Sequence, residues 1–220
     1  MSKLKIAVLI SGRGTNLQAL IDAAQDPDYP AEICLVLSNK PGVLGLERAE
    51  KAGLETEVLS HKGYEDRESF DQAIDTVLKA YDINLVCLAG FMRLLTPDFV
   101  SRWKDRMINI HPSLLPAFKG LDTHARALEQ GVRIAGCTIH FVRPKMDDGP
   151  ILMQGAVAVM DDDTPESLAA RILEVENRLY PQAVRLIAEG RVRVSGNRVL
   201  VDGQVPPSQA LIHPDPTSGA

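Results

Sequence analysis

The chain has 220 residues, of which 45% are hydrophobic and 24% are charged, and these are the proportions of an ordinary globular protein. Its formal net charge of -5 argues against a broad nucleic-acid-binding face, which needs a basic surface. The three cysteines form no CxxC pair and lie in apolar runs, so they predict buried free thiols in a reducing cytoplasm. No apolar run approaches the roughly 18 residues of a membrane span, and no targeting signal is evident.

Strand-like and helical patterns alternate along the first half of the chain. In order, they are strand Lys5–Ile10, helix Asn16–Ala24, strand Glu32–Leu37, helix Leu44–Ala52, strand Val58–Leu59, helix Arg67–Tyr81, strand Asn84–Ala89 and helix Pro97–Trp103. This rhythm is typical of βαβ units. It predicts an α/β fold with a Rossmann-like, mostly parallel sheet and helices on both faces.

The second half follows a different pattern. A strand at Met107–Ile110 continues the series, but strands Gly136–Val142 and Ile151–Met160 are separated only by a loop, which predicts a mixed or antiparallel part. A long helix is expected from Pro165 to about Glu189, with Thr164 as its cap. We therefore divide the chain into a main domain (residues 1–190), a C-terminal hairpin extension (residues 191–205) and a tail predicted to be disordered (residues 206–220).

The first candidate site follows the first strand. Small residues from Ser11 to Asn16 lead directly into a helix, where free backbone amides can bind an anion such as a phosphate. The spacing of a Walker loop is absent, and Leu17 stands where the dinucleotide fingerprint needs a third glycine. The alternative is a simple strand-to-helix turn capped by Thr15 or Asn16.

The second candidate site is Asn109 with His111. Two residues apart on an extended chain, they lie on the same side if the strand continues through His111. An amide donor beside an imidazole suits acyl transfer to an amine, since one stabilises an oxyanion and the other moves a proton. In the alternative interpretation, Asn109 is a turn residue and His111 a loop histidine. Ser113 lacks the surroundings of a nucleophile.

A third segment, residues 143–150, offers two adjacent carboxylates. Asp147 placed against His111 would orient the ring and balance the charge of its protonated form. Asp148 is expected to face solvent on the other side of the turn, and the whole loop could equally be a solvated turn. The histidines show no metal-ligand spacing, so no catalytic metal is expected.

Together these segments resemble the phosphoribosylglycinamide formyltransferase family. The resemblance rests on five stretches: Leu9–Leu17, Leu88–Leu94, Asn109–Pro116, Thr138–Val142 and Met146–Pro150. The segment Asn-x-His-Pro-Ser-Leu-Leu-Pro is shared by folate-dependent formyl-transfer and hydrolysis domains, and the Gly-Arg-Gly-Thr-Asn loop narrows the choice to this family.

The resemblance implies a role for each matching residue. The ribonucleotide would be bound by Gly14, Thr15, Asn16 and Glu176. The folate would be bound by Arg67, Met92, Arg93, Leu94, Leu95, Asn109, Arg143, Pro144, Lys145, Met146 and Asp147. The catalytic residues would be Asn109, His111 and Asp147.

The resemblance also implies a reaction, namely direct transfer of the formyl group of 10-formyltetrahydrofolate to the primary amine of glycinamide ribonucleotide in purine synthesis. Rivals are formyltetrahydrofolate deformylase, a methionyl-tRNA formyltransferase-like enzyme and a non-catalytic nucleotide-binding module. A methionyl-tRNA formyltransferase normally carries an added C-terminal tRNA-binding domain, whereas only about thirty residues follow the long helix here. We expect a cytoplasmic monomer or homodimer that acts on small molecules, with no nucleic-acid or membrane partner.

Overall fold

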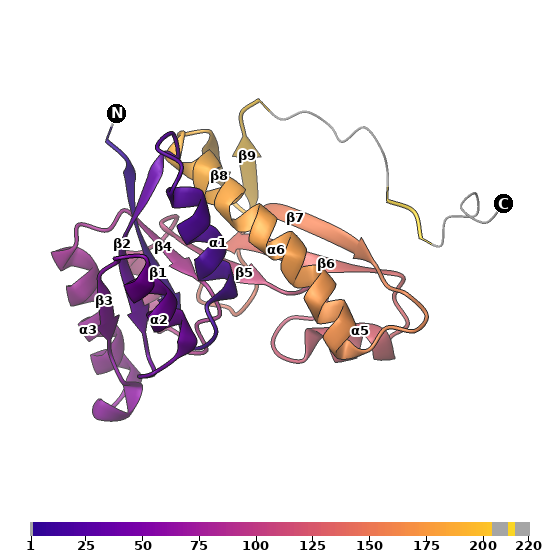
Figure 1. Ribbon diagram of the computed structural model, residues 1–220, viewed down its shortest axis with the longest axis horizontal. Coiled ribbons are helices and arrows are strands. Elements are labelled where there is room, and N and C mark those ends of the chain that lie inside the picture. Colours follow the sequence, from indigo (N-terminus) through magenta and orange to yellow (C-terminus); the bar gives the residue numbers. More distant parts are fainter. Residues whose placement is uncertain (1, 204–210, 214–220) are drawn as a thin grey trace.

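The computed structural model describes residues 2–203 and 211–213, and its centre is one mixed sheet (Figure 1). The strands are β1 (Leu4–Ile10), β2 (Ala31–Ser38), β3 (Thr56–Val58), β4 (Leu85–Leu88), β5 (Met107–His111), β6 (Ile134–Phe141), β7 (Ile151–Ala158), β8 (Val192–Ser195) and β9 (Arg198–Val201). The helices are α1 (Thr15–Ala24), α2 (Leu44–Lys51), α3 (Arg67–Ala80), α4 (Pro97–Arg102), α5 (Thr123–Glu129) and α6 (Pro165–Ala188), with a 3-10 turn at His61–Gly63.

The strand order is β3-β2-β1-β4-β5-β6-β7-β9-β8. From β3 to β5 all neighbours are parallel, whereas β5–β6 and β6–β7 are antiparallel. Strands β2 and β3 lie on one side of β1, whereas β4 and β5 lie on its other side. The direction in which the sheet grows therefore reverses between β1 and β4. In a doubly wound sheet, ligands bind at the carboxyl ends of the strands beside such a reversal.

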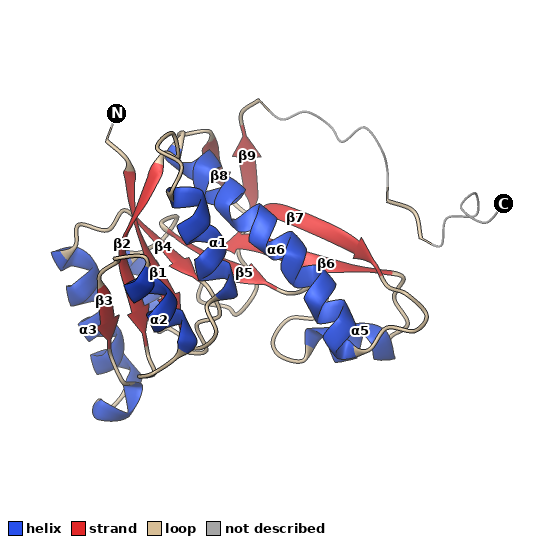
Figure 2. Cartoon of the chain, viewed as in Figure 1, coloured by secondary structure: helices blue, strands red, loops and turns tan. Residues whose placement is uncertain are grey.

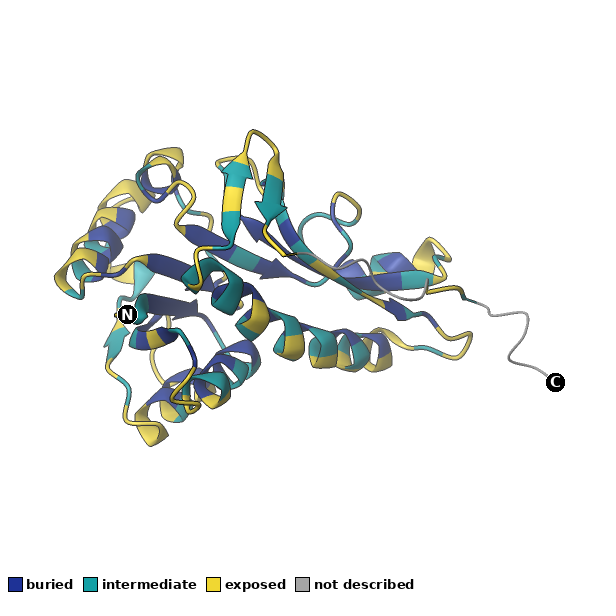
Figure 3. Cartoon of the chain, turned by 90° about the horizontal axis from the view of Figure 1, so that it is seen from above, coloured by how far each residue is buried: buried dark blue, intermediate teal, exposed yellow. Residues whose placement is uncertain are grey.

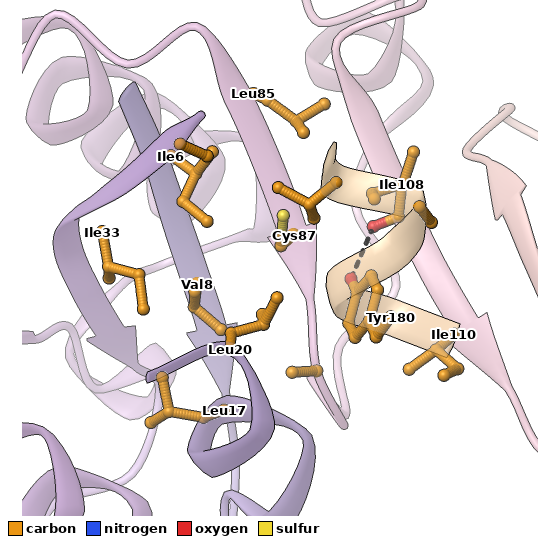
Figure 4. Packing of buried hydrophobic residues seen from close by; sticks show 14 of the residues in the cluster. Ile6, Val8, Leu17, Leu20, Ile33, Leu85, Cys87, Ile108, Ile110 and Tyr180 are labelled. Carbon is orange, nitrogen blue, oxygen red and sulfur yellow. Dashed lines mark hydrogen bonds between the residues drawn. The ribbon is translucent and has the colours of Figure 1, made fainter. Parts of the chain in front are cut away.

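Two apolar clusters cover the two faces of the parallel part, and helices flank the sheet on both faces (Figure 2). Helices α1 and α6 pack on one face, where Tyr180 lies beside Cys87, Ile108 and Ile110 (Figure 4). The Tyr180 hydroxyl donates to the Leu88 carbonyl over 2.9 Å, which gives this fully buried phenol a partner. Helices α3 and α4 pack on the opposite face. The central strands are consequently buried, and the outer helix surfaces are exposed (Figure 3).

Helix α6 joins the two halves of the sheet, since it contacts α1 at one end and β6, β7 and α5 at the other (Figure 1). It begins at Pro165, and the Thr164 side chain accepts from the Ser167 amide as a cap. It lies close to β7 because Gly155 has no side chain: a Cβ there would be 2.3 Å from Val175 Cγ1.

The predicted fold class is confirmed, and most predicted elements lie within a few residues of the observed ones. Helix α5 was not predicted, and the third strand is Thr56–Val58 rather than Val58–Leu59. Cys34 is only half-buried, contrary to expectation, whereas Cys87 and Cys137 are buried. The hairpin β8–β9 is present and extends the sheet edge by pairing with β7.

The domain division at residue 190 stays a prediction, and the tail predicted at residues 206–220 falls mostly outside the described residues. Among the described residues, no helix is long and apolar enough to cross a membrane.

Candidate active site

The loop after β1 leads into helix α1, whose N-terminus no side chain caps. Gly14 is the N-cap of α1 in the left-handed conformation (φ 68°), and no side chain caps the helix, so the alternative of a Thr15 or Asn16 cap is wrong. The first amides of α1 are therefore left without a capping side chain. Gly14 is also required by packing, because a Cβ there would lie 2.7 Å from Gly45 Cα.

Asn16 and Glu176, which are 160 residues apart in sequence, meet beside this loop. The Asn16 Nδ2 donates to Glu176 Oε2 over 2.8 Å, and both residues are buried. Burial raises the pKa of Glu176, and the hydrogen bond from Asn16 opposes that shift. The Asn16 Oδ1 is buried and has no hydrogen-bond partner among the described residues. This buried pair thus retains an acceptor for a further group.

Ser11 links this loop to the segment after β4. Its hydroxyl donates to Asn39 Oδ1 over 2.5 Å and accepts from the Met92 amide over 2.8 Å. Ser11 and Asn39 are both buried. The loop assigned to the ribonucleotide and the segment assigned to the folate are therefore held together by one hydroxyl group.

Asn109 and His111 both lie in β5, which continues through His111, so the two side chains project from the same face. Asn109 is therefore not a turn residue. His111 is 6% exposed; its Nδ1 is 3.6 Å from Asp147 Oδ2, and its Nε2 is 3.0 Å from the Phe118 carbonyl. The Nε2 contact is a hydrogen bond to an acceptor and holds the ring in one orientation, whereas Nδ1 is too far from Asp147 for a hydrogen bond and stays free for a further partner.

The two adjacent carboxylates differ in their surroundings. Asp147, in the left-handed conformation (φ 49°), faces His111, and its Oδ2 also accepts from the Gly120 amide over 2.9 Å. Asp148 is exposed, as expected, and it pairs with Lys119 and, over 3.1 Å, with Lys145. Asp148 thus ties its loop to the segment that follows β5.

The residues assigned to the folate are spread over a larger area. Arg67 and Arg93 line a cleft of about 600 Å³ between α3 and the segment after β4. Met92, Leu94 and Met146 are 63%, 57% and 50% exposed, an apolar surface that a flat ligand could cover. The remaining assigned residues behave differently: Leu95 packs into the core, Arg143 pairs with Asp105, and Pro144 and Lys145 are exposed. The lining of the cleft includes neither Asn109, His111 nor Asp147.

One polar residue of the site was not predicted as a site residue. His140, the penultimate residue of β6, is 2% exposed, and its Nε2 is 3.3 Å from Asn109 Nδ2 and 3.8 Å from Asp147 Oδ1. Its sequence surroundings are those of an apolar strand. His140 lies in Thr138–Val142, one of the stretches that carry the family resemblance, but its place in the site follows only from the strand pairing that sets it opposite Asn109.

The described residues contain no group of three or more His, Cys, Asp or Glu side chains placed to hold a metal ion. An uncapped helix N-terminus at the reversal point of the sheet, with an amide, two imidazoles and a carboxylate grouped around the carboxyl end of β5, is typical of a doubly wound α/β enzyme.

Comparison with known proteins narrows this class. Residues 4–184 match the sequence profile of the formyl transferase family. The phosphoribosylglycinamide formyltransferase of Haemophilus influenzae is 42% identical, over 92% of this chain and 96% of the relative. The crystal structure of glycinamide ribonucleotide transformylase 1 from Symbiobacterium toebii superimposes with a TM-score of 0.88 at 47% identity, covering 90% of this chain and 94% of that one. The chain belongs to the phosphoribosylglycinamide formyltransferase family.

A longer relative is also similar. The trifunctional purine biosynthetic protein adenosine-3 of Gallus gallus is 52% identical over 88% of this chain, which spans only 19% of that relative. The likeness to that protein thus concerns one part of a larger polypeptide.

Proposed function

We propose that this chain transfers the formyl group of 10-formyltetrahydrofolate to the primary amine of glycinamide ribonucleotide in purine synthesis. The observation that carries the proposal is the cluster of Asn109, His111 and Asp147 beside an uncapped helix N-terminus, in a chain of this family. The named relatives do not favour the deformylase, the tRNA formyltransferase or the non-catalytic module.

The ribonucleotide would bind at the α1 end of the site. The amides at Gly14, Thr15 and Asn16 suit its phosphate, because a helix N-terminus carries partial positive charge. The Glu176 carboxylate and the free Asn16 Oδ1 suit the hydroxyl groups of its ribose.

The folate would lie along the segment after β4. The exposed side chains of Met92, Leu94 and Met146 suit a flat ring. In the cleft, which is also lined by Glu65, Asp66 and Glu68, the guanidinium groups of Arg67 and Arg93 are the groups that can pair with carboxylates. The Arg93 Nε is buried without a partner among the described residues, so an anionic ligand would satisfy it. Arg143 supports this surface through Asp105, and we assign Leu95 a packing role.

In the reaction, the amine attacks the formyl carbon, and its lone pair forms the new C–N bond. The carbonyl electron pair moves onto oxygen, and collapse of the tetrahedral intermediate breaks the bond to the folate nitrogen. Asn109 donates an N–H to the oxyanion, and protonated His111 donates its Nδ1–H, which at 3.6 Å from Asp147 Oδ2 is not hydrogen-bonded to that carboxylate. A contact of this kind is worth roughly a hundredfold or more in rate. Asp147 orients His111 and holds a water that carries the amine proton to the departing nitrogen.

An acceptor comparison tests this proposal. 10-Formyltetrahydrofolate is supplied with glycinamide ribonucleotide, with initiator methionyl-tRNA or with water alone, and the deformylated folate is measured. We expect turnover only with the ribonucleotide. Equal turnover with water alone would contradict the proposal and indicate a deformylase. The cytoplasmic location and the monomeric or homodimeric state stay predictions.

A further inference from the structure

His140 lies directly opposite Asn109 in the antiparallel pair β5–β6, so both side chains project from the same face of the sheet. The pairing of β6 with β7 shifts register between Ile139 and His140, an irregularity of the kind that changes the direction of a side chain. His140 is a polar residue placed between Ile139 and Phe141, both of which are buried apolar residues.

The hydrogen bonds of the ring define its tautomer. The His140 Nδ1 is 3.1 Å from the carbonyl oxygen of Phe141, which can only accept, so Nδ1 carries the hydrogen. In the neutral ring, Nε2 then has a free lone pair and accepts from Asn109 Nδ2 over 3.3 Å. The Phe141 carbonyl is itself enclosed, since a Cβ at Gly149 would lie 1.7 Å from its oxygen.

This chain of contacts fixes the orientation of the Asn109 amide. An asparagine amide can turn over and exchange its donor and acceptor ends, and β5 alone does not decide between the two. With one Nδ2 hydrogen bonded to His140, the second hydrogen stays available at the site. We propose that His140 is a positioning residue that holds the Asn109 amide with its N–H toward the reacting oxygen, an inference that rests on the proposed formyl transfer.

The neutral ring is the form that this role needs, because a protonated ring would present N–H to Asn109 and favour the reversed amide. Burial lowers the pKa of His140, and the charges of His111 and Lys119 act in the same direction. The Phe141 carbonyl and Asp147, whose Oδ1 is 3.8 Å from Nε2, oppose that shift.

Two substitutions that differ by one methylene group test the inference. His140→Gln can place its side-chain oxygen where Nε2 stands and can accept from Asn109. His140→Asn can still donate to the Phe141 carbonyl but does not reach Asn109. We expect His140→Asn to lower kcat about tenfold to a hundredfold, as misplaced catalytic groups do, with dissociation constants for both substrates nearly unchanged. His140→Gln should stay within about threefold of the unsubstituted enzyme.

A double variant separates positioning from packing. Because His140 acts through Asn109, adding His140→Asn to Asn109→Ala should lower kcat by less than about twofold further. Thermal unfolding of each variant shows whether it is folded. If His140→Asn does not fold, the kcat of His140→Gln still tests the inference. The inference would be overturned if folded His140→Gln lost kcat or if folded His140→Asn kept it. It would also be overturned if the losses of kcat from His140→Asn and Asn109→Ala were additive in the double variant. Absence of transfer in the unsubstituted enzyme would instead contradict the proposed function.

Discussion

The two halves of the sheet contribute to the site in different ways. The parallel half, strands β3 to β5, presents strand ends: the turn after β1, the segment after β4 and His111 at the end of β5. The antiparallel half presents His140 from within β6 and Asp147 from the loop before β7. One half thus offers loops that can enclose ligands, and the other offers groups that contact Asn109 and His111. We therefore expect substitutions in the loops of the parallel half to reduce substrate binding. Substitutions at the junction of the two halves, where β5 pairs with β6, should reduce turnover.

The largest effect is expected at the junction itself. His111→Ala and Asn109→Ala should each lower kcat by about a hundredfold to a thousandfold, because each removes a donor to the oxyanion. The dissociation constants of both substrates should change little, and the double variant should lose less than the product of the two effects. Steady-state kinetics with binding titrations checks this, with Asn197→Ala in the exposed β8–β9 turn as the control. Near-normal turnover in either single variant would make that residue structural.

The adjacent carboxylates provide a matched pair of substitutions. Asp147→Asn keeps an oxygen for the Gly120 amide but removes the charge facing His111, so kcat should fall about tenfold to a hundredfold. Asp148→Asn weakens only exposed ion pairs with Lys119 and Lys145, which solvent screens, so kcat should change by a few-fold at most. Kinetics at one pH and thermal unfolding distinguish the two. A larger loss at Asp148 would reverse the assignment.

Two glycines of the first loop separate folding from binding. Gly14→Ala should destabilise the protein by about 1–3 kcal/mol, because φ is 68° and Gly45 leaves no room. Gly12→Ala meets no heavy atom within 4 Å, so the free energy of unfolding should be unchanged while the KM for the ribonucleotide rises roughly tenfold, equivalent to about 1.4 kcal/mol. Urea unfolding and kinetics test this. An unchanged KM in Gly12→Ala would contradict the assignment of the ribonucleotide phosphate to this loop.

The smallest expected effect concerns stability at Glu176. Burial raises the pKa of this carboxyl in the folded state, so the folded protein holds the proton at a pH where the unfolded chain has lost it. The stabilisation that this carboxyl group contributes is fully present at a pH below its pKa in the unfolded chain. It is lost as the pH rises through the pKa of the group in the folded protein. Glu176→Gln removes this loss and keeps an acceptor for Asn16, so the variant should gain stability over the parent as pH rises from about 4 to 7. Equal pH dependence of the two melting temperatures would contradict this interpretation.

The sequence allows the prediction of features that depend on neighbours along the chain. The turn after β1, the shared face of Asn109 and His111, and the capped start of α6 follow from local spacing. Helix α5 was missed because it has only seven residues and its N-cap, Asp122, makes no side-chain cap hydrogen bond.

Contacts between distant segments were beyond local patterns. His140 belongs to a stretch that carries the family resemblance, but local spacing assigned it no role, because only the strand pairing sets it opposite Asn109. The surroundings of Asp148 depend on Lys119, 29 residues away, so composition alone described it as a solvated turn residue. The Asn16–Glu176 contact spans 160 residues and likewise depends on the fold.

The central claim is that the amine of the ribonucleotide attacks the formyl group directly at this junction. Its most direct test is a carbon balance with 10-formyltetrahydrofolate labelled with carbon-13 in the formyl group, followed by NMR in the presence of glycinamide ribonucleotide. We predict one labelled formamide on the ribonucleotide for each folate consumed, with no labelled formate and no label left on the protein. Label released as formate or retained on the protein would contradict direct transfer.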